Sequence, residues 1–257
     1  MHAFVSLAYL DVEKSGSTFV SGFLRDFLDD EEVGFGKHEP LEDSPPAGRL
    51  HVLSVRDPFD TYLSLYSYGC QGRGVLGRSL RRQGFGALYD GTADGFRRWL
   101  DVVLDPANAA LMRPLGYHRS GVAEHVGLLS FRVARLSAPR PLEWLSQVGS
   151  ADELVAAYRS RSVVDEVLRN ESLVADLERL VRRPDLRWRP TREAALEALG
   201  GLARVNASER VDRGPGFTVP PGAWEAVAER EVLLTEVFGY DGARWSGEAH
   251  RGLRSRV

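Results

Sequence analysis

The sequence predicts an α/β fold with a mostly parallel central sheet, formed as a single domain over residues 1–257. Two short apolar runs, 2–10 and 50–55, have the length and the bounding residues of buried strands. Each run is followed by a segment whose apolar residues recur at helical spacing. Strands that alternate with helices are typical of parallel sheets, which bind ligands beyond the carboxyl ends of their strands. We therefore expect a ligand site at the loops that follow these two runs.

The first run leads into a loop, 13–18, with the sequence Glu-Lys-Ser-Gly-Ser-Thr, and then into a helix expected over 19–28. Backbone N–H groups at a helix start point outward and the helix dipole favours an anion there, so a phosphate group is the natural ligand. The Walker pattern places its lysine after two glycines, whereas Lys14 precedes the turn that contains glycine. This order disfavours an ordinary P-loop kinase or GTPase.

The second run ends in Arg56, Asp57 and Pro58. Asp57 is a favourable helix N-cap and Pro58 a favourable first helical residue, so we expect a helix over 59–68. Its apolar residues repeat at helical spacing.

A second phosphate can be bound after this run. An arginine fork binds a phosphate monoester through two parallel hydrogen bonds, which makes Arg56 a candidate ligand. Ser64 lies about two turns into the expected helix and would reach the same phosphate. The alternative is that Arg56 pairs with Asp57 or Asp60 at the surface.

The rest of the chain is expected to alternate between helices and loops. Caps, turn residues and spacing predict helices over 93–104, 152–159, 173–181, 192–199 and 223–238, a turn into a short helix over 139–144, and a late strand over 162–168. Glycines and arginines alternate through 69–91, which predicts an inserted, mobile basic loop. The segment from about 247 onward is expected to be a flexible basic tail.

Both loops resemble those of one enzyme family. Residues 14–19, Lys-Ser-Gly-Ser-Thr-Phe, are similar to the 5′-phosphosulfate loop of sulfotransferases that use 3′-phosphoadenosine 5′-phosphosulfate (PAPS). Residues 54–60, Ser-Val-Arg-Asp-Pro-Phe-Asp, together with Ser64 and Tyr66, resemble the 3′-phosphate loop of that family.

The likeness extends along most of the chain. Residues 168–177 and 204–208, and the end of the last expected helix at 237–240, resemble segments of the carbohydrate-type and bacterial branch of the family. The similarity runs from residue 1 to about 242 and is loose over 71–161. It implies a three-layer sandwich with the P-loop-NTPase-like sulfotransferase fold, and an enzyme that moves the sulfuryl group of PAPS to a hydroxyl.

The resemblance also implies a role for each matching residue. Lys14 would be a catalytic residue that neutralises charge at the bridging oxygen of the leaving phosphate. Arg56 and Ser64 would hold the 3′-phosphate. Further residues expected to bind the 5′-phosphate or to close over the nucleotide are Ser15, Gly16, Ser17, Thr18, Phe19, Ser208 and Arg210. For Ser208 and Arg210 a structural loop role is the alternative.

Transfer to a hydroxyl also requires a general base. His38 resembles, in its position before the second strand, the histidine of related enzymes, and an imidazole with a pKa near about 6.5 accepts a proton at neutral pH. Some relatives use glutamate there, so Glu39 is the alternative base. His118 and His125 are candidates for the acceptor pocket, with a structural role as the alternative. Glu171 is expected to brace the sheet edge or cap the next helix instead of acting as an acid catalyst.

Composition limits the partners and the compartment. The net charge of −3 gives no general case for nucleic-acid binding. The only cysteine, Cys70, excludes an intrachain disulfide and fits a reducing compartment, and the N-terminal apolar run is too short to span a membrane. We therefore expect a cytoplasmic protein without stable membrane insertion. We expect no metal cofactor, because no spacing of metal-ligating residues predicts a site.

The sequence leaves the acceptor and the oligomeric state open. A hydroxyl of a sugar, a glycolipid or a secondary metabolite would each fit. Two other functions are compatible with the two loops. A divergent ATP-dependent kinase would require Mg²⁺, and a catalytically silent nucleotide-binding module would bind the nucleotide without turnover.

Overall fold

Contacts between residues divide the chain into two units in the computed structural model, which describes residues 1–112, 114–202, 222–243 and 245. The first unit consists of Met1–Asp57, Arg132–Leu145 and Ala156–Asp212, and the second of Pro58–Phe131, Ser146–Val155 and Arg213–Val257. The predictions for Ser208, for Arg210 and for the tail from about 247 lie outside the described residues. That residues 1–257 act as one domain stays a prediction, and each unit is described by itself.

A mixed five-stranded sheet, in the order β3-β1-β2-β4-β5, forms the centre of the first unit. Within the described residues, the pairs β2–β4 and β4–β5 are parallel, whereas β1 pairs with β2 and with β3 in antiparallel fashion. The α/β class is confirmed, but the prediction of a mostly parallel sheet is wrong. The strands are β1 (His2–Phe4), β2 (Leu7–Leu10), β3 (Glu32–Phe35), β4 (Leu50–Val55) and β5 (Glu166–Arg169).

The antiparallel part arises because the apolar run 2–10 folds into a hairpin instead of a single strand. His2 lies opposite Tyr9, and the chain turns at Val5 and Ser6 between β1 and β2. The backbone N–H and the hydroxyl of Ser6 both donate to Oδ2 of Asp30, at 2.7 and 2.6 Å. The group that fixes this turn lies 24 residues away along the chain, so no local pattern indicated the turn.

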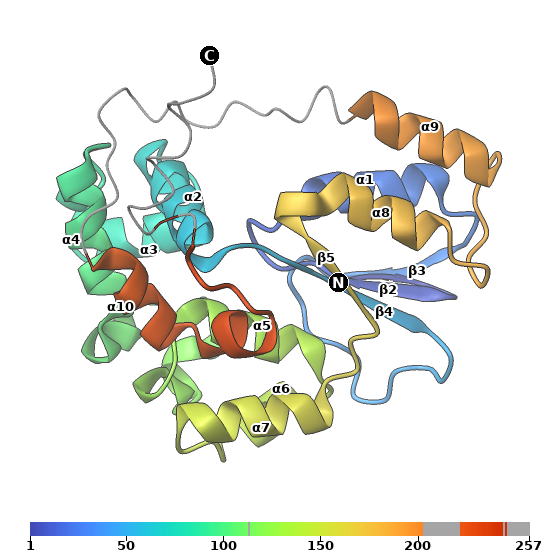
Figure 1. Cartoon of the computed structure of the whole chain (residues 1–257). Coiled ribbons are helices and arrows are strands. Elements are labelled where there is room, and N and C mark those ends of the chain that lie inside the picture. The colour runs from blue at the N-terminus through green and yellow to red at the C-terminus, as the bar shows by residue number, and fades with distance from the viewer. Residues whose placement is uncertain (113, 203–221, 244, 246–257) are drawn as a thin grey trace. The chain divides into compact units, whose positions relative to one another are not determined.

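Three helices lie together on one side of this sheet (Figure 1). They are α1 (Ser17–Phe27), α8 (Leu173–Val181) and α9 (Arg192–Leu202). Leu24 of α1, Leu177 of α8 and Val52 of β4 are fully buried in the core that the helices share with the sheet. Burial of such a side chain stabilises the fold by about 1.5–3 kcal/mol relative to its exposure. This core holds α1, and with it the loop before α1, on the sheet.

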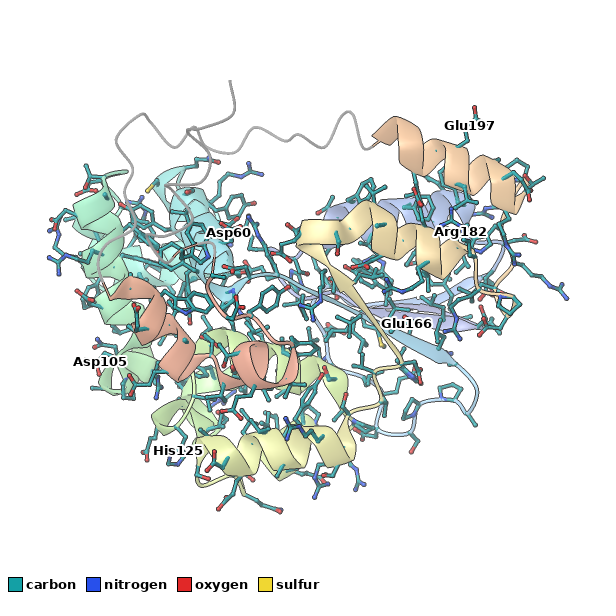
Figure 2. All side chains as sticks on the ribbon, viewed as in Figure 1. Asp60, Asp105, His125, Glu166, Arg182 and Glu197 are labelled. Atoms are coloured by element: carbon teal, nitrogen blue, oxygen red, sulfur yellow. The ribbon has the colours of Figure 1, made fainter. Side chains whose placement is uncertain are left out.

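Ion pairs join β5 to α8 and to the segment that directly follows this helix. Glu166 of β5, which is labelled in Figure 2, accepts from Arg183 at 2.7 Å and lies 3.8 Å from Arg179. Both arginine side chains are partly exposed, so each pair contributes at most about 1 kcal/mol. The apolar core therefore determines where α8 lies, and the ion pairs support that placement.

The helices predicted from caps and spacing are confirmed within a few residues of their ends. The helices expected over 59–68, 93–104, 139–144 and 152–159 are observed as α2 (Pro58–Cys70), α4 (Ala93–Leu104), α6 (Pro141–Leu145) and α7 (Ala151–Arg161), and those over 19–28, 173–181 and 192–199 as α1, α8 and α9. Pro58 is the first residue of α2, as expected. Within the described residues, every helix is too short or too polar to cross a bilayer.

Aromatic side chains from α2 and α4 form the core of the second unit. Trp99 packs against Phe96 and Tyr66, with ring centroids 6.0 and 5.6 Å apart, and its indole N–H donates to the hydroxyl of Tyr89 at 2.8 Å. Trp99 is completely buried. Such pairs contribute about 0.5–1.5 kcal/mol each beyond the area they bury.

Much of the segment 69–91 is helical where a loop was predicted, and its mobility stays a prediction. The segment contains α3 (Val75–Arg82) and a short 3-10 helix, η1 (Phe85–Leu88). Leu76 and Leu80 lie one turn apart on α3 and are buried, and the guanidinium of Arg81 lies 4.8 Å from the centroid of the Tyr89 ring. The glycines flank these helices more often than they interrupt them, so their number did not indicate a loop.

The helix expected over 223–238 is divided by a buried carboxyl group. α10 (Ala223–Arg230) ends before Glu231, and a π-helical turn, η6 (Leu233–Val237), follows. The carboxyl oxygens of Glu231 accept hydrogen bonds from the N–H groups of Leu129 and Ser130 at 3.2 and 2.6 Å, and from the hydroxyl of Tyr62. These two N–H groups belong to the first turn of α5 (Leu128–Ser137), so Glu231 caps that helix.

The sequence did not predict α5, because almost all of its residues are buried and it shows no alternation of apolar and polar faces. The remaining short elements are η2 (Pro106–Leu111), η3 (Pro114–Arg119), η4 (Val122–Glu124) and η5 (Asn170–Ser172).

The stability of the fold is expected to depend on the protonation of Glu231. Burial raises the pKa of this carboxyl above its ordinary value of 4.5, although the hydrogen bonds from Tyr62, Ser130 and Leu129 act in the opposite direction. A raised pKa in the folded state stabilises the fold below about pH 4.5 and loses this effect as the pH rises through the folded-state pKa.

The test compares the wild type with Glu231→Gln, which cannot ionise, by urea unfolding from about pH 4 to about pH 8. The free energy of unfolding of the wild type should decrease relative to that of the variant as the pH rises, by at most about 1.4 kcal/mol per pH unit. A difference that is independent of pH would contradict a raised pKa.

Candidate functional site

Three loops of the first unit meet at one edge of its sheet. Because β2 and β4 are parallel, with Leu10 opposite Leu53, the chain leaves both strands at the same edge. β5 is parallel to β4 and ends there too. Oε1 of Glu171, just after β5, accepts the backbone N–H of Asp57 at 2.9 Å and so joins two of the loops. The prediction that Glu171 braces the sheet edge is confirmed.

The loop after β2 contains two residues with left-handed backbone conformations, Lys14 (φ 70°) and Gly16 (φ 89°). Glycine adopts this conformation without strain, whereas other residues rarely do. A Cβ atom on Gly16 would also lie 2.9 Å from Nδ2 of Asn170 and 2.9 Å from Cδ2 of Leu173. The loop can therefore approach the end of β5 only with glycine at position 16.

The start of α1 presents several hydrogen-bond donors that the described part of the chain does not use. Within the described residues, the N–H groups of Gly16, Ser17 and Thr18 and the hydroxyls of Ser17 and Thr18 have no partner. The N–H of Phe19 differs, because it donates to the carbonyl of Gly16 at 3.0 Å. Successive free N–H groups at a helix start bind anions, so Gly16, Ser17 and Thr18 are suited to a phosphate. A nucleotide contact of Phe19 stays a prediction.

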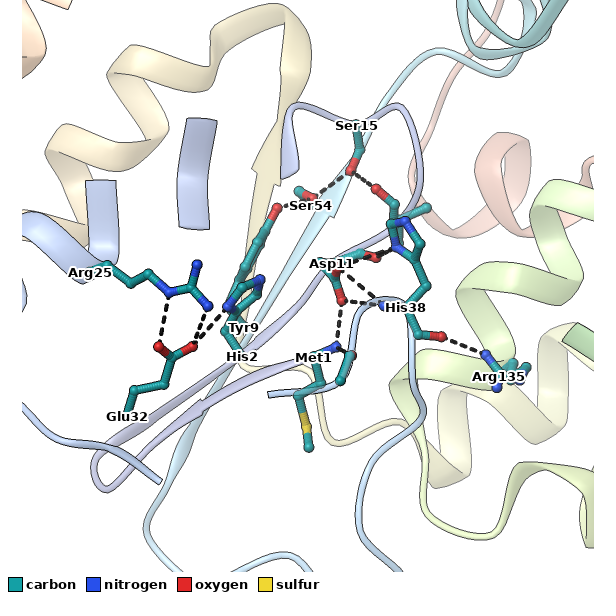
Figure 3. Close-up of polar contacts among 12 residues, drawn as sticks. Met1, His2, Tyr9, Asp11, Ser15, Arg25, Glu32, His38, Ser54 and Arg135 are labelled. Atoms are coloured by element: carbon teal, nitrogen blue, oxygen red, sulfur yellow. Dashed lines mark hydrogen bonds and ion pairs between the residues drawn. The ribbon is translucent and has the colours of Figure 1, made fainter. Parts of the chain in front are cut away.

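Ser15 has a different role from its neighbours, because its side chain is buried. Its hydroxyl donates to the carbonyl of Val12 at 2.7 Å and accepts from the hydroxyl of Ser54 at 2.5 Å. Ser54 in turn lies 2.6 Å from the hydroxyl of Tyr9. Burial raises the pKa of Tyr9, so its phenol stays protonated. The hydroxyl of Tyr9 therefore donates to Ser54, Ser54 donates to Ser15, and Ser15 donates to the carbonyl of Val12. These buried hydroxyls fix the loop to β2 and β4 (Figure 3).

Arg56 contacts the same loop from the end of β4. Its Nη1 donates to the carbonyl of Lys14 at 3.3 Å, so the two loops predicted to bind phosphates lie next to each other. Ser64 lies partly buried on α2 in the second unit, and its pairing with Arg56 stays a prediction.

His38 is held beside the loop by Asp11, the residue that follows β2. Its N–H donates to Oδ1 and Oδ2 of Asp11 at 3.1 and 3.2 Å, and its Nδ1 lies 2.6 Å from the carbonyl oxygen of Asp11 (Figure 3). An Nδ1–H that donates to this carbonyl leaves the lone pair on Nε2. Within the described residues, no group is hydrogen-bonded to Nε2. The side chain is 19 % exposed, so Nε2 is suited to accept a proton from a ligand.

His38 also has a left-handed backbone conformation (φ 58°). Non-glycine residues in this conformation cost about 1–3 kcal/mol and are concentrated at functional sites. The carboxylate of Asp11, which is 2 % exposed, lies 3.2 Å from Nδ1 and also pairs with the N-terminal ammonium of Met1. Asp11 thus fixes both the backbone and the ring of His38.

Sequence reasoning missed three residues of this site: Asp11, Arg132 and Arg135. Asp11 lies two residues before the predicted loop, and this position was a signal for it. Arg132 and Arg135 lie on α5, and each contacts a loop of the site: Arg132 pairs with Glu13 and Arg135 donates to the carbonyl of His38. They could not be found from the sequence because the helix itself was not predicted.

His118 and His125 lie in the second unit, so their place in an acceptor pocket stays a prediction. Glu39 is exposed next to His38 and remains the alternative base.

Comparisons of the chain with protein-family models, with curated proteins and with solved structures found no match. The residues and contacts of this site are therefore the basis for a functional proposal.

The loop geometry is tested by Gly16→Ala, with Gly22→Ala as the matched control. Gly16→Ala should lower the free energy of unfolding by about 1–3 kcal/mol, because the new Cβ is both strained and crowded. Gly22 lies within α1 with open space around its Cα, so Gly22→Ala should stabilise the fold by about 0.5–1 kcal/mol. Equal effects of the two variants in urea unfolding would contradict the described loop.

Proposed function

We propose that this protein is a PAPS-dependent sulfotransferase that transfers a sulfuryl group to the hydroxyl of a small-molecule or carbohydrate acceptor. The observation that carries the proposal is the meeting of three features at one sheet edge. These are the open donors at Gly16, Ser17 and Thr18, the guanidinium of Arg56, and the imidazole of His38. The order of these residues in the sequence and the resemblance of both loops to this family support the same function.

Each group has a defined part in the transfer. The donors at the start of α1 hold the 5′-phosphate of the nucleotide, and Arg56 holds the 3′-phosphate. Lys14 neutralises the charge that develops on the bridging oxygen as the bond from this oxygen to sulfur breaks. The oxygen leaves with the bonding electron pair as part of 3′-phosphoadenosine 5′-phosphate (PAP).

The acceptor hydroxyl attacks sulfur in line with the leaving oxygen. Its oxygen forms the new bond to sulfur, and its proton passes to Nε2 of His38. Asp11 orients the ring for this step, because its carboxylate accepts the backbone N–H of His38 and its carbonyl oxygen lies 2.6 Å from Nδ1. No step requires a metal ion, and the enzyme would act in the cytoplasm on a sugar, a glycolipid or a secondary metabolite.

Nucleotide binding is tested by calorimetric titration with PAP, adenosine 5′-monophosphate and ATP, each with and without Mg²⁺. PAP should bind more tightly than the 5′-monophosphate because it has a second phosphate, and Mg²⁺ should have no effect. Arg56→Gln should weaken PAP binding about ten- to hundredfold and leave binding of the 5′-monophosphate unchanged, as expected for one charge-assisted contact.

Tighter binding of ATP with Mg²⁺ than of PAP would overturn the proposal in favour of a divergent ATP-dependent kinase. Binding of PAP without turnover of PAPS across a broad panel of hydroxyl acceptors would favour a catalytically silent module.

Turnover is tested with Lys14→Ala and His38→Ala, by measuring the release of PAP from PAPS in the presence of acceptors. Lys14→Ala should abolish turnover, and His38→Ala should reduce it by about two to four orders of magnitude. The controls are Lys37→Ala, which removes the only other lysine, and Glu39→Gln. Full activity of Lys14→Ala would exclude the assignment. A larger loss for Glu39→Gln than for His38→Ala would make Glu39 the base.

A further inference from the structure

Two arginines lie one turn apart on α5 and both contact the proposed site. Nη2 of Arg132 pairs with Oε2 of Glu13 at 2.8 Å, next to Lys14 in the loop after β2. Nη1 of Arg135 donates to the carbonyl oxygen of His38 at 2.8 Å (Figure 3). The two positive charges are therefore placed beside the groups that would transfer the sulfuryl group and accept the proton.

Arg132 has more donors than the chain satisfies. Its side chain is 3 % exposed, and its Nε and Nη1 are buried without a partner among the described residues. A buried polar group without a hydrogen bond destabilises the fold, and a charged group does so more strongly. Glu13, which is 20 % exposed, is the one carboxylate in ion-pair contact with this guanidinium in the described part of the chain.

Arg135 is a partly buried cation that has no carboxylate partner among the described residues. In the described part of the chain its hydrogen bond is to a neutral carbonyl, and no carboxylate lies within ion-pair distance. Burial lowers the pKa of Arg135, the charge of Glu39 raises it, and the charge of Arg132 lowers it again. The positive charges of Arg132 and Arg135 therefore oppose each other, and among the described residues Glu13 is the one carboxylate in ion-pair contact with either of them.

An anion bound next to Arg132 and Arg135 would balance their excess positive charge. The Nε and Nη2 groups of Arg135 are not used within the described residues and could donate to an oxyanion in a planar fork. The anion would also offset the repulsion between the two guanidinium groups. A neutral ligand would do neither.

We propose that Arg135, backed by the buried charge of Arg132, binds an oxyanion group on the acceptor, close to the hydroxyl that His38 deprotonates. The acceptor is then an acidic molecule, such as a sugar with a carboxylate, a sulfate ester or a phosphate ester. This inference rests on the proposed function, because it deepens the acceptor class of the same site. It assigns Arg135 as a specificity-determining residue and Arg132 as a positioning residue.

The test is an NMR titration of the protein, saturated with PAP, with D-glucuronate and with D-glucose as probes. Saturation with PAP occupies the phosphate loops, so that the probe anion cannot bind there. The wild type should bind glucuronate at least about tenfold more tightly than glucose, since a charge-assisted contact contributes about 1.5–3 kcal/mol. Arg135→Gln should lose this preference, and Arg135→Lys, which keeps the charge, should retain most of it.

The control variant is Arg187→Gln, which removes an exposed positive charge outside the α5 pair and should bind glucuronate as the wild type does. Equal affinity of the wild type for glucuronate and glucose, or an unchanged preference in Arg135→Gln, would overturn the inference. Calorimetric titration with PAP is performed on each variant beforehand, and Arg135→Gln should bind PAP normally. A wild type that fails to bind PAP would overturn the proposed function instead, and glucuronate binding that depends on Arg135 would then still be visible without PAP.

Discussion

The parallel pairing of β2 with β4 is the constraint on which the rest of the site depends. It places the end of both strands at one edge of the sheet, so that the loop containing Lys14 and the residue Arg56 become neighbours although they are 42 positions apart. The buried hydroxyl chain from Tyr9 through Ser54 and Ser15 then fixes the loop to both strands. Each of these contacts lies within the first unit, and each is made by a side chain or carbonyl whose position the sheet determines. Without this pairing, the two loops would not lie next to each other and could not contact each other.

Two residues of the site have strained backbone conformations, and hydrogen bonds to neighbouring residues hold them there. Lys14 and His38, the two residues proposed to perform the chemistry, both have left-handed backbone conformations that side chains other than glycine rarely adopt. His38 is held in place by the carboxylate and the carbonyl of Asp11, and the carbonyl of Lys14 accepts a hydrogen bond from Arg56. A cost of about 1–3 kcal/mol per residue is a large share of the net stability of a domain. Left-handed conformations at Lys14 and His38 are consistent with a pre-organised site.

The sequence predicted the elements whose signals are local. The N-cap and proline at the start of α2, the strand β4 and the helices α4 and α8 were found, because caps, apolar runs and helical spacing act over a few residues. Three elements were missed because their causes are not local. The turn at Ser6 depends on Asp30, and the strand β3 depends on pairing with β1. The helix α5 is buried on almost all sides and so shows no amphipathic pattern. The same limit applies to the site. Its loops were predicted, but Asp11, Arg132 and Arg135 became visible only through contacts that the fold creates.

The central claim is that two loops at one sheet edge each hold one phosphate of the same nucleotide. The most direct measurement is ³¹P NMR of PAP titrated into the wild type and into Arg56→Gln, because the two phosphorus resonances report separately on the two loops. This arrangement of the two loops predicts that both resonances shift on binding to the wild type, and that in Arg56→Gln the 3′ resonance returns toward its free value while the 5′ resonance stays shifted. A shift of the 5′ resonance alone in the wild type, or equal changes of both resonances in Arg56→Gln, would contradict it.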